Sequence, residues 1–555
     1  MVRYQNKTAV DFVIIGGGGA GSVVAKELST AGFQVLILEQ GPYLHERDFE
    51  HDELKFKHIF DPVPFGQETL TNVHALQPHT FRKTESENAV VAPFLEYGRC
   101  IGGGTVHFNA NYWRFHEVDF RERSTWGQLP GTGLVDWPLD YAELEPYYTK
   151  AEWDLGISGL AGANPFDPPR SKPYPLPPMP IKSSGVLLDR AARKLGWHPY
   201  PAPLAILSQP YKGRAPCAHC GFCIYFGCEW GAKSSTLAAV IPAAEKTGRC
   251  EIRANSYVRK ISTNRAGRVD GVIYFDRQKK EHFQKAKAVV VCCNGAETPR
   301  LLLMSKSNLF PQGLANSSGL VGKYFMIDPA TLCYGTFEQP LNEYKSVQVT
   351  RVVQDFYDSN PDRGFFGGGG IDARFGFYPI EFGLNGLPPG TPRWGLGFKE
   401  ALTHNFNRTI TLYAHTTVLP LESNSISLDP QIKDAWGLPA IRVTYKSHPD
   451  DFATMKFFSD RSMELLEAAG AIKKWAAPIE DLTAAGHLMG TCRMGDSPSH
   501  SVVDKYHRSH DVRNLFIVDG SSLVTSGRNQ PTCTIQALAY RASDHMIRAA
   551  KGAEI

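Results

Sequence analysis

The fold is decided by Asp11-Phe-Val-Ile-Ile-Gly-Gly-Gly-Gly-Ala-Gly21, which joins a short apolar run to a glycine-rich turn. The apolar run has the length of a buried strand. Ser22–Leu28 follows with apolar residues at helical spacing, and a second apolar run, Gln34–Leu38, ends on Glu39. Strand, helix and strand in this order predict a βαβ unit with a parallel sheet.

The glycine turn has the pattern of a dinucleotide-binding loop. Gly16, Gly18 and Gly21 have the spacing G-x-G-x-x-G between the predicted strand and the predicted helix. The first glycine permits a tight turn, the second lets the backbone approach a pyrophosphate, and the third lets helix and strand pack closely. Glu39 ends the next strand, where a carboxylate can accept hydrogen bonds from a ribose diol. The pattern predicts a dinucleotide site but does not separate NAD from FAD.

The overall charge excludes some classes of partner. The chain has 555 residues with 59 Lys and Arg against 56 Asp and Glu, a net charge of +3. So small a charge gives no electrostatic footprint for nucleic acid. The most apolar stretch, residues 10–25, is interrupted by Gly16–Gly19, so it does not resemble the roughly 20 apolar residues of a membrane-spanning helix. We see no signal-peptide pattern at the N-terminus, which taken alone predicts a cytoplasmic protein.

Four of the eleven cysteines crowd into one short segment. Cys217, Cys220, Cys223 and Cys228 have the spacing C-x2-C-x2-C-x4-C. Thiolates at this density can surround an iron–sulfur cluster. Zinc is the rival interpretation, although structural zinc sites more often use two separated pairs. Unliganded thiols are a third reading, and a disulfide framework is typical of short secreted chains instead.

The remaining segments predict a second, largely antiparallel region. Residues 331–450 have strand-like alternation, as in Thr409–His415. The proline-rich stretch 155–216 predicts an extended excursion over a surface. Gly367–Gly370 predicts a flexible loop or lid hinge, and a last helix is expected at about residues 534–549.

Several motifs in order resemble the glucose-methanol-choline (GMC) oxidoreductase family. The resemblance covers residues 10 to about 547, and its most specific part is His487-Leu-Met-Gly-Thr-Cys-Arg-Met-Gly495 with the segments that follow it. The matching segments are Tyr97–Arg114, Asp136–Leu139, Leu144–Tyr148, Asn294–Pro299, His487–Gly495, Val502–Asp504, Asn514–Gly520 and Pro531-Thr532. The resemblance implies FAD as cofactor and an α/β + β fold, in which a split Rossmann-like FAD-binding domain carries a second substrate domain built on an antiparallel sheet.

The resemblance also implies domain boundaries. The FAD-binding domain is expected to combine residues 1–45, 90–125, 235–330 and 480–555. Residues 126–234 form an excursion that contains the cysteine loop 217–228, and residues 331–479 form the substrate-binding domain.

By the same resemblance, FAD is bound by residues of both glycine turns and of the C-terminal block. His107 stands where some relatives attach FAD covalently through a histidine, and a histidine that packs on the flavin without a bond is the alternative. The implied cofactor-binding residues are Gly16, Gly18, Gly21, Glu39, Arg99, Gly103, Gly104, Thr105, His107, Asn109, Asp519 and Gly520.

His487 is the implied catalytic base. Oxidation of an alcohol requires loss of a hydroxyl proton, for which a group with a near-neutral pKa is suited, and FAD takes the hydride. The family's second catalytic position is an Asn or His, whereas this chain has Asn529-Gln530 before Pro531. An amide can orient a hydroxyl but cannot act as a base. Either Asn529 or Gln530 is therefore expected to face the flavin.

The cysteine segment resembles the iron–sulfur loop of bacterial membrane-linked sugar and gluconate dehydrogenases. Relatives often use three cysteines for a [3Fe-4S] cluster, whereas four are present here, so [4Fe-4S] stays open. A one-electron cluster implies a one-electron acceptor such as cytochrome c. The resemblance further implies a small partner subunit with a twin-arginine signal and a periplasmic, membrane-associated location.

The leading expectation is thus an FAD-dependent dehydrogenase of a sugar, either a pyranose or a glucoside, with oxidation at C3 to a 3-keto sugar as one form of the reaction. A gluconate-type sugar-acid dehydrogenase comes next. An oxygen-dependent oxidase with a structural cysteine site is a further alternative. A non-enzymatic flavin-fold subunit is the last one.

Overall fold

The computed structural model describes residues 2–53, 76–327, 329–481 and 486–555. Parts of the predicted FAD-binding segments, residues 1, 328 and 482–485, therefore lie outside the described residues. The helices are α1 (Gly21–Thr30), α3 (Glu122–Trp126), α4 (Tyr141–Leu155), α5 (Ser183–Lys194), α6 (Thr236–Ala239), α7 (Ile241–Lys246), α8 (Glu297–Met304), α9 (Pro379–Glu381), α10 (Gly395–Phe406), α11 (Pro449–Ala468) and α12 (Thr532–Lys551).

The strands of the described residues form three sheets. They are β1 (Val10–Ile15), β2 (Val35–Leu38), β3 (His79–Arg82), β4 (Val90–Val91), β5 (Tyr200–Pro201), β6 (Cys250–Arg253), β7 (Tyr257–Thr263), β8 (Val269–Phe275), β9 (Glu281–Val291), β10 (Ala330–Thr336), β11 (Val349–Val353), β12 (Gly369–Arg374), β13 (Thr409–Thr416), β14 (Ser425–Lys433), β15 (Pro439–Thr444), β16 (Lys473–Ala476) and β17 (Leu515–Ile517).

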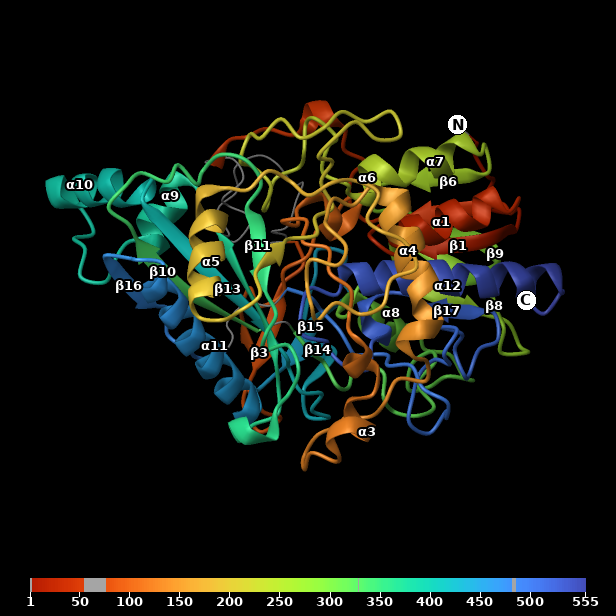
Figure 1. Ribbon diagram of the computed structural model, residues 1–555. Coiled ribbons are helices and arrows are strands. Elements are labelled where there is room, and N and C mark those ends of the chain that lie inside the picture. The colour runs from red at the N-terminus through yellow and green to blue at the C-terminus, as the bar shows by residue number, and fades with distance from the viewer. Residues whose placement is uncertain (1, 54–75, 328, 482–485) are drawn as a thin grey trace.

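A seven-stranded sheet contains the predicted βαβ unit. β1 pairs in parallel with β2 and with β9, β6 lies outside β2, and β17 pairs with β9 from the far end of the chain. β2 and β17 are fully buried apolar runs and β1 is nearly so, as expected for a parallel sheet covered on both faces. α12 packs against α1 and α4 beside this sheet, on the right in Figure 1.

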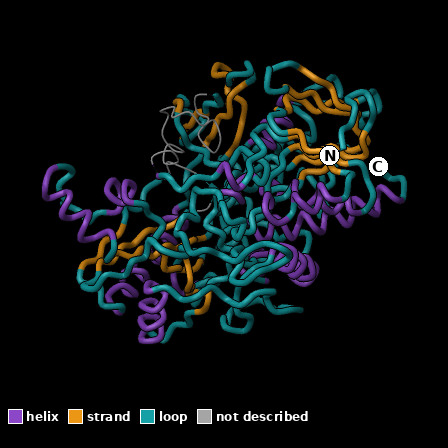
Figure 2. The backbone as a smooth tube through the Cα atoms, turned by 90° about the horizontal axis from the view of Figure 1, so that it is seen from above, coloured by secondary structure: helices purple, strands orange, loops and turns teal. Residues whose placement is uncertain are grey.

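A six-stranded antiparallel sheet forms the other side of the molecule. Its order is β16-β10-β13-β12-β11-β5, and α11 packs on β10 and β13 while α5 packs on α11 and β11. Figures 1 and 2 show that these strands and helices lie apart from the parallel sheet. The antiparallel region predicted for 331–450 is present, and it takes further strands from residues 200–201 and 473–476. The domain boundaries themselves stay predictions.

Two sequence-based expectations are corrected by the fold. Gly369 and Gly370 are not a lid hinge: they begin the buried strand β12, and a Cβ at Gly369 would lie 2.0 Å from the His415 carbonyl oxygen. The close backbone approach explains the glycine there. The proline-rich stretch is also more than a surface excursion, because Ile157, Leu204 and Ile206 from it are buried in the main core.

A smaller sheet, in the order β14-β15-β3-β4, lies between the two larger ones in Figure 1. One continuous hydrophobic core runs from the parallel sheet through α4 to this small sheet. In the described part of the chain, no helix combines the length and the apolar character that crossing a membrane requires.

Candidate functional site

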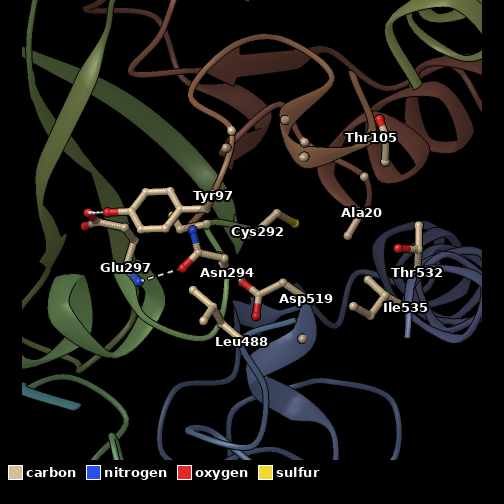
Figure 3. A pocket seen from close by; sticks show the side chains of 18 of the residues that line it. Ala20, Tyr97, Thr105, Cys292, Asn294, Glu297, Leu488, Asp519, Thr532 and Ile535 are labelled. Carbon is tan, nitrogen blue, oxygen red and sulfur yellow. Dashed lines mark hydrogen bonds between the residues drawn. The ribbon is translucent and has the colours of Figure 1, made fainter. Parts of the chain in front are cut away.

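A cavity of about 450 Å³ lies where the sequence motifs converge. One end is walled by the two glycine turns, and the other by His487 and by side chains of β12 and β13. Figure 3 shows how Tyr97, Asn294 and Asp519 approach the cavity from separate parts of the chain. Segments hundreds of residues apart in the sequence therefore build one site.

The two glycine turns pack directly on each other. Gly103 has a φ of +53°, and a Cβ there would lie 2.8 Å from the Gly18 Cα. The Gly102 amide donates to the Gly17 carbonyl over 2.8 Å. Only glycine permits this conformation and this backbone contact. Gly21 does not line the cavity but packs against Gly16, where a Cβ would lie 2.0 Å from the carbonyl oxygen.

Glu39 is buried at the cavity wall at the end of β2. Its carboxylate accepts hydrogen bonds from the amides of Gly17 and Gly41, each over 2.9 Å. Burial raises the pKa of Glu39, and the backbone donors oppose that shift. Each carboxylate oxygen retains a further lone pair, which a ribose diol can occupy.

Asp519 stands at the C-terminal side of the cavity, after β17. Its oxygens accept from the Thr298 hydroxyl over 2.6 Å, the Ser521 amide over 2.8 Å and the Asn294 amide over 3.2 Å. Burial raises the pKa of Asp519. The Asp519 side chain connects the loop after β9 to the turn at Gly520. It therefore holds the backbone of both segments in place at the cavity wall.

His107 lines the cavity beside the second glycine turn. Burial, together with the nearby Lys233 cation, lowers the pKa of His107 to about 3, so its imidazole is neutral. Its Nδ1 is buried without a hydrogen-bond partner. A neutral imidazole with an unpartnered nitrogen at the wall fits contact with a bound flavin. Taken with the glycine cradle and Glu39, the residues present fit FAD.

His487 faces the cavity in a strained backbone conformation. Its φ is +51°, which is uncommon for a residue other than glycine and is frequent at functional sites. The carbonyl of Leu488 is clamped between two glycines, because a Cβ at Gly295 or Gly520 would lie 2.3 or 2.5 Å from it. The clamp keeps the backbone at His487 in one position.

Of the two amides, Gln530 lines the cavity and Asn529 does not. The Asn529 amide donates to the Arg114 carbonyl over 3.2 Å and to the Tyr357 hydroxyl over 3.3 Å. It belongs to a buried network behind the site. Of the two residues predicted at this catalytic position, only Gln530 is therefore at the cavity.

The structure adds polar residues that the sequence analysis did not select. Arg374, Tyr413 and His415 line the cavity from β12 and β13, and Glu96 lines it beside Tyr97. Burial and the nearby Glu381 raise the pKa of Glu96 to about 7. The alternating pattern of residues 331–450 predicted the sheet, but it did not indicate which face of its strands lies near His487.

The predicted residues divide clearly between those at the cavity and those away from it. Arg99 is buried behind the second glycine turn, outside the lining. The predicted residues that line the cavity are Gly16, Gly18, Glu39, Gly103, Gly104, Thr105, His107, Asn109, His487, Asp519, Gly520 and Gln530.

The cysteine loop touches the wall of the cavity. Ile224 and Tyr225 line the cavity, and the Tyr225 amide donates to the His107 carbonyl over 2.7 Å. All four cysteines are free thiols, and the pKa of Cys223 is raised to about 12, chiefly by burial and in part by the other three. The expected ligand set is not formed, however: across the described residues no group of three or more His, Cys, Asp or Glu converges as metal ligands.

Family comparison matches this chain over most of its length. Residues 10–329 match the N-terminal and residues 420–539 the C-terminal model of the GMC oxidoreductases. The chain belongs to the GMC oxidoreductase family, which confirms the predicted fold class and FAD as its cofactor.

Three characterised relatives are similar over nearly their whole length. The 2-methyl-1,2-propanediol dehydrogenase of Mycolicibacterium austroafricanum is 35% identical, over 97% of this chain and 95% of the relative. The gluconate 2-dehydrogenase flavoprotein of Pantoea cypripedii is 30% identical, over 96% and 92%. The fructose dehydrogenase large subunit of Gluconobacter japonicus is 30% identical, over 98% and 99%. The chain is accordingly an FAD-dependent oxidoreductase of the sugar and alcohol dehydrogenase type.

Solved structures agree on the fold. Pyridoxine 4-oxidase from "Mesorbium loti" superposes with a TM-score of 0.64 at 17% identity, covering 97% of this chain and 99% of that one. Formate oxidase of Aspergillus oryzae superposes with a TM-score of 0.65 at 16% identity, covering 99% of both.

Proposed function

We propose that this protein oxidises a secondary or anomeric alcohol of an uncharged sugar or polyol. The observation that carries the proposal is one cavity with Glu39 and the glycine turns at one end and His487 with Gln530 at the other. A dinucleotide held by the glycine turns would share this cavity with His487 and Gln530. A pyranose or glucoside oxidised at C3 to a 3-keto sugar is the substrate form that we favour.

His487 takes the hydroxyl proton of the substrate. Bound FAD supplies the acceptor for the hydride that leaves the carbinol carbon. The imidazole faces the cavity and its backbone is clamped, so it can stay in place while the substrate exchanges. Gln530 cannot accept a proton, and its amide orients the hydroxyl toward His487.

The charges at the cavity favour a neutral substrate over a sugar acid. The Arg374 guanidinium, which lines the substrate end, is paired with the buried Asp372 through its Nε, 2.6 Å from Oδ1. A carboxylate substrate would have to compete with this pair, and Glu96 would repel it whenever ionised. Two relatives are named for uncharged substrates, a diol and fructose, and one for gluconate. A gluconate-type reaction is the second candidate.

We further propose that the cysteine loop binds an iron–sulfur cluster, either [3Fe-4S] or [4Fe-4S]. The donor chemistry is suitable, and the pKa of Cys223 is raised in part by the nearby thiols of Cys217, Cys220 and Cys228. The buried Lys233 ammonium donates to the carbonyls of Cys223 and Phe226 over 2.6 and 2.7 Å, so it places a positive charge beside the loop, which would favour an anionic cluster. The thiols would have to converge on binding. An oxygen-using oxidase is the alternative, and Streptomyces relatives are named as oxidases.

The proposed partners follow from the cluster. Cytochrome c would accept single electrons, and a small subunit with a twin-arginine signal would carry the folded protein to the periplasm and the membrane. The relative named as a large subunit supports a heteromeric assembly. Co-purification of tagged protein with a small subunit and a cytochrome tests this part. A cytoplasmic protein that purifies alone would contradict it.

Anaerobic spectroscopy tests the reaction. We expect a neutral sugar or diol to bleach the flavin absorption faster than gluconate does, with a responding cluster signal by EPR. Cys223→Ser should remove the cluster signal, whereas Cys250→Ser, at a buried thiol on β6, should not. Bleaching without iron, together with peroxide formation in air, would favour the oxidase.

We also propose that His107 attaches FAD covalently. The neutral imidazole and the unpartnered Nδ1 at the cavity wall support this role. Flavin that stays with the protein after acid precipitation, and is released in His107→Ala, is the expected result. Free flavin in the supernatant of the wild type would show that the histidine only packs against the cofactor.

A further inference from the structure

A polar layer on two neighbouring strands lies behind Gln530. In the antiparallel register of β12 and β13, Asp372 stands opposite Tyr413 and Gly370 opposite His415. Because side chains alternate along a strand, Asp372, Arg374, Tyr413 and His415 share one face. The last three of these line the substrate end of the cavity.

Arg374 is held rigidly within this layer. It is 5% exposed, it pairs with the fully buried Asp372 through two nitrogens, and its guanidinium lies 4.0 Å from the centre of the Tyr413 ring. Its Nη2 also lies 3.2 Å from Nε2 of His415. A guanidinium has donors and no acceptor, so it can only donate to that nitrogen.

This contact decides the tautomer of His415. Nε2 must carry a lone pair to accept from Arg374, so the ring proton of a neutral imidazole lies on Nδ1. Protonation at Nε2 would turn a hydrogen bond into a clash of two donors. The groups facing the ring include Arg374 and Asp372 from β12, Tyr413 from its own strand, and His487, whose ring centre is 6.2 Å away.

The same nitrogen then orients Gln530. The Gln530 amide nitrogen is in close contact with Nε2 of His415. Nε2 has one lone pair, so Arg374 and Gln530 share it as two donors to one acceptor, and the amide nitrogen, not the amide oxygen, must face it. The opposite atom, Oε1, is buried and has no hydrogen-bond partner, although Gln530 lines the cavity and is 4% exposed. A buried acceptor without a donor is costly unless a ligand supplies one.

We propose that His415 is a positioning residue: anchored by the Arg374–Asp372 pair, it fixes the Gln530 carboxamide so that Oε1 accepts a hydrogen bond from a substrate hydroxyl next to the one whose proton His487 takes. This inference rests on the proposed alcohol oxidation and deepens it. In this arrangement Gln530 contacts the substrate, and His415 takes no part in proton transfer.

A double-mutant cycle tests whether His415 acts through Gln530. The rate of anaerobic flavin reduction should fall ~10-fold in His415→Leu and in Gln530→Leu, the size of one oriented hydrogen bond. The double variant should be no slower than Gln530→Leu, and His415→Gln, which keeps an acceptor, should recover most of the rate. Thr411→Val on the same strand is the matched control and should keep the wild-type rate. Losses that multiply, or an unchanged rate in His415→Leu, would overturn the inference.

A second measurement needs no substrate. Its only variant is His415→Gln, which should keep most of the activity. Histidine-labelled, flavin-loaded protein should show one imidazole resonance, assigned by its absence in His415→Gln, that keeps the Nδ1-protonated neutral pattern from pH 5.5 to 8.5. A resonance that titrates in this range, or an Nε2-protonated pattern, would overturn the inference alone. A flavin that no alcohol bleaches would instead overturn the proposed function.

Discussion

At the scale of single residues, backbone constraint explains why one histidine among many is the candidate base. The φ of +51° at His487 and the glycines that clamp Leu488 constrain the backbone that carries its imidazole at the cavity. Another buried histidine, His507, lies in the core away from the cavity, where its Nδ1 is 3.0 Å from the Ile517 carbonyl oxygen and burial lowers its pKa to about 3. Position, and not residue type, distinguishes His487.

His487→Asn should slow flavin reduction by substrate about 100- to 10,000-fold, because it removes the proton acceptor while keeping the size of the side chain. Anaerobic stopped-flow absorbance at the flavin bands measures this rate. His500→Asn, at an exposed histidine outside the cavity lining, should keep the wild-type rate. A His487 variant that reduces flavin at the normal rate would refute the assignment.

At the scale of elements, the second glycine turn is tied to the first by geometry that only glycine permits. The positive φ of Gly103 and the 2.8 Å approach to Gly18 leave no room for a Cβ. The neighbouring Gly104 has ordinary φ and open space around it. The two positions therefore form a matched pair for testing the turn.

Gly103→Ala should lower the thermal unfolding midpoint of the flavin-free protein and reduce FAD content, since strain of about 1–3 kcal/mol enters the turn. Gly104→Ala should leave the flavin-free midpoint unchanged. Differential scanning fluorimetry with and without FAD measures both effects. Equal midpoints for the two variants would show that the turns do not need this contact.

The start of α11 carries a pH-sensitive cap. Asp451 is buried and accepts from the His448 amide over 2.8 Å and the Leu419 amide over 3.1 Å. Burial raises its pKa from 3.8 to about 7. The folded protein thus binds this proton more tightly than the unfolded chain, and the resulting stability is full below pH 3.8 and is lost as the pH rises toward 7.

Asp451→Asn should therefore gain stability relative to the wild type as the pH rises from 5 to 8, by up to about 2.7 kcal/mol. The difference between the two unfolding curves at each pH is the measurement. Asp460→Asn, at an exposed position of the same helix, is the control and should show no such trend. A constant difference across this range would contradict the buried-carboxyl explanation.

At the scale of the whole molecule, the cavity joins the parallel sheet to the antiparallel one. Its walls come from the first forty residues, the middle of the chain and the C-terminal block. A cofactor bound there would contact the N-terminal, middle and C-terminal segments at once, although these lie far apart in the sequence. FAD should accordingly stabilise the molecule as a unit.

Flavin-free protein reconstituted with FAD at 100 times its Kd should gain about 2.7 kcal/mol of unfolding free energy. The thermal midpoint, followed during titration with FAD, should rise with the logarithm of its concentration. If His107 holds the flavin covalently, His107→Ala supplies the flavin-free form. A midpoint that does not respond to FAD would contradict a site spanning both sheets.

The βαβ unit, the glycine turns and Glu39 were predictable from the sequence, because they depend on spacing within one segment. The family resemblance singled out His107 and His487, both of which line the cavity. The final helix was also predicted, as residues 534–549 against the observed Thr532–Lys551. The choice between the neighbours Gln530 and Asn529 depends on the packing of the folded chain, in which Gln530 lines the cavity and the Asn529 amide donates to the Arg114 carbonyl. The tertiary structure alone brought His415 and Arg374 to His487, because strand register and the facing of one sheet against another arise from contacts distant in sequence.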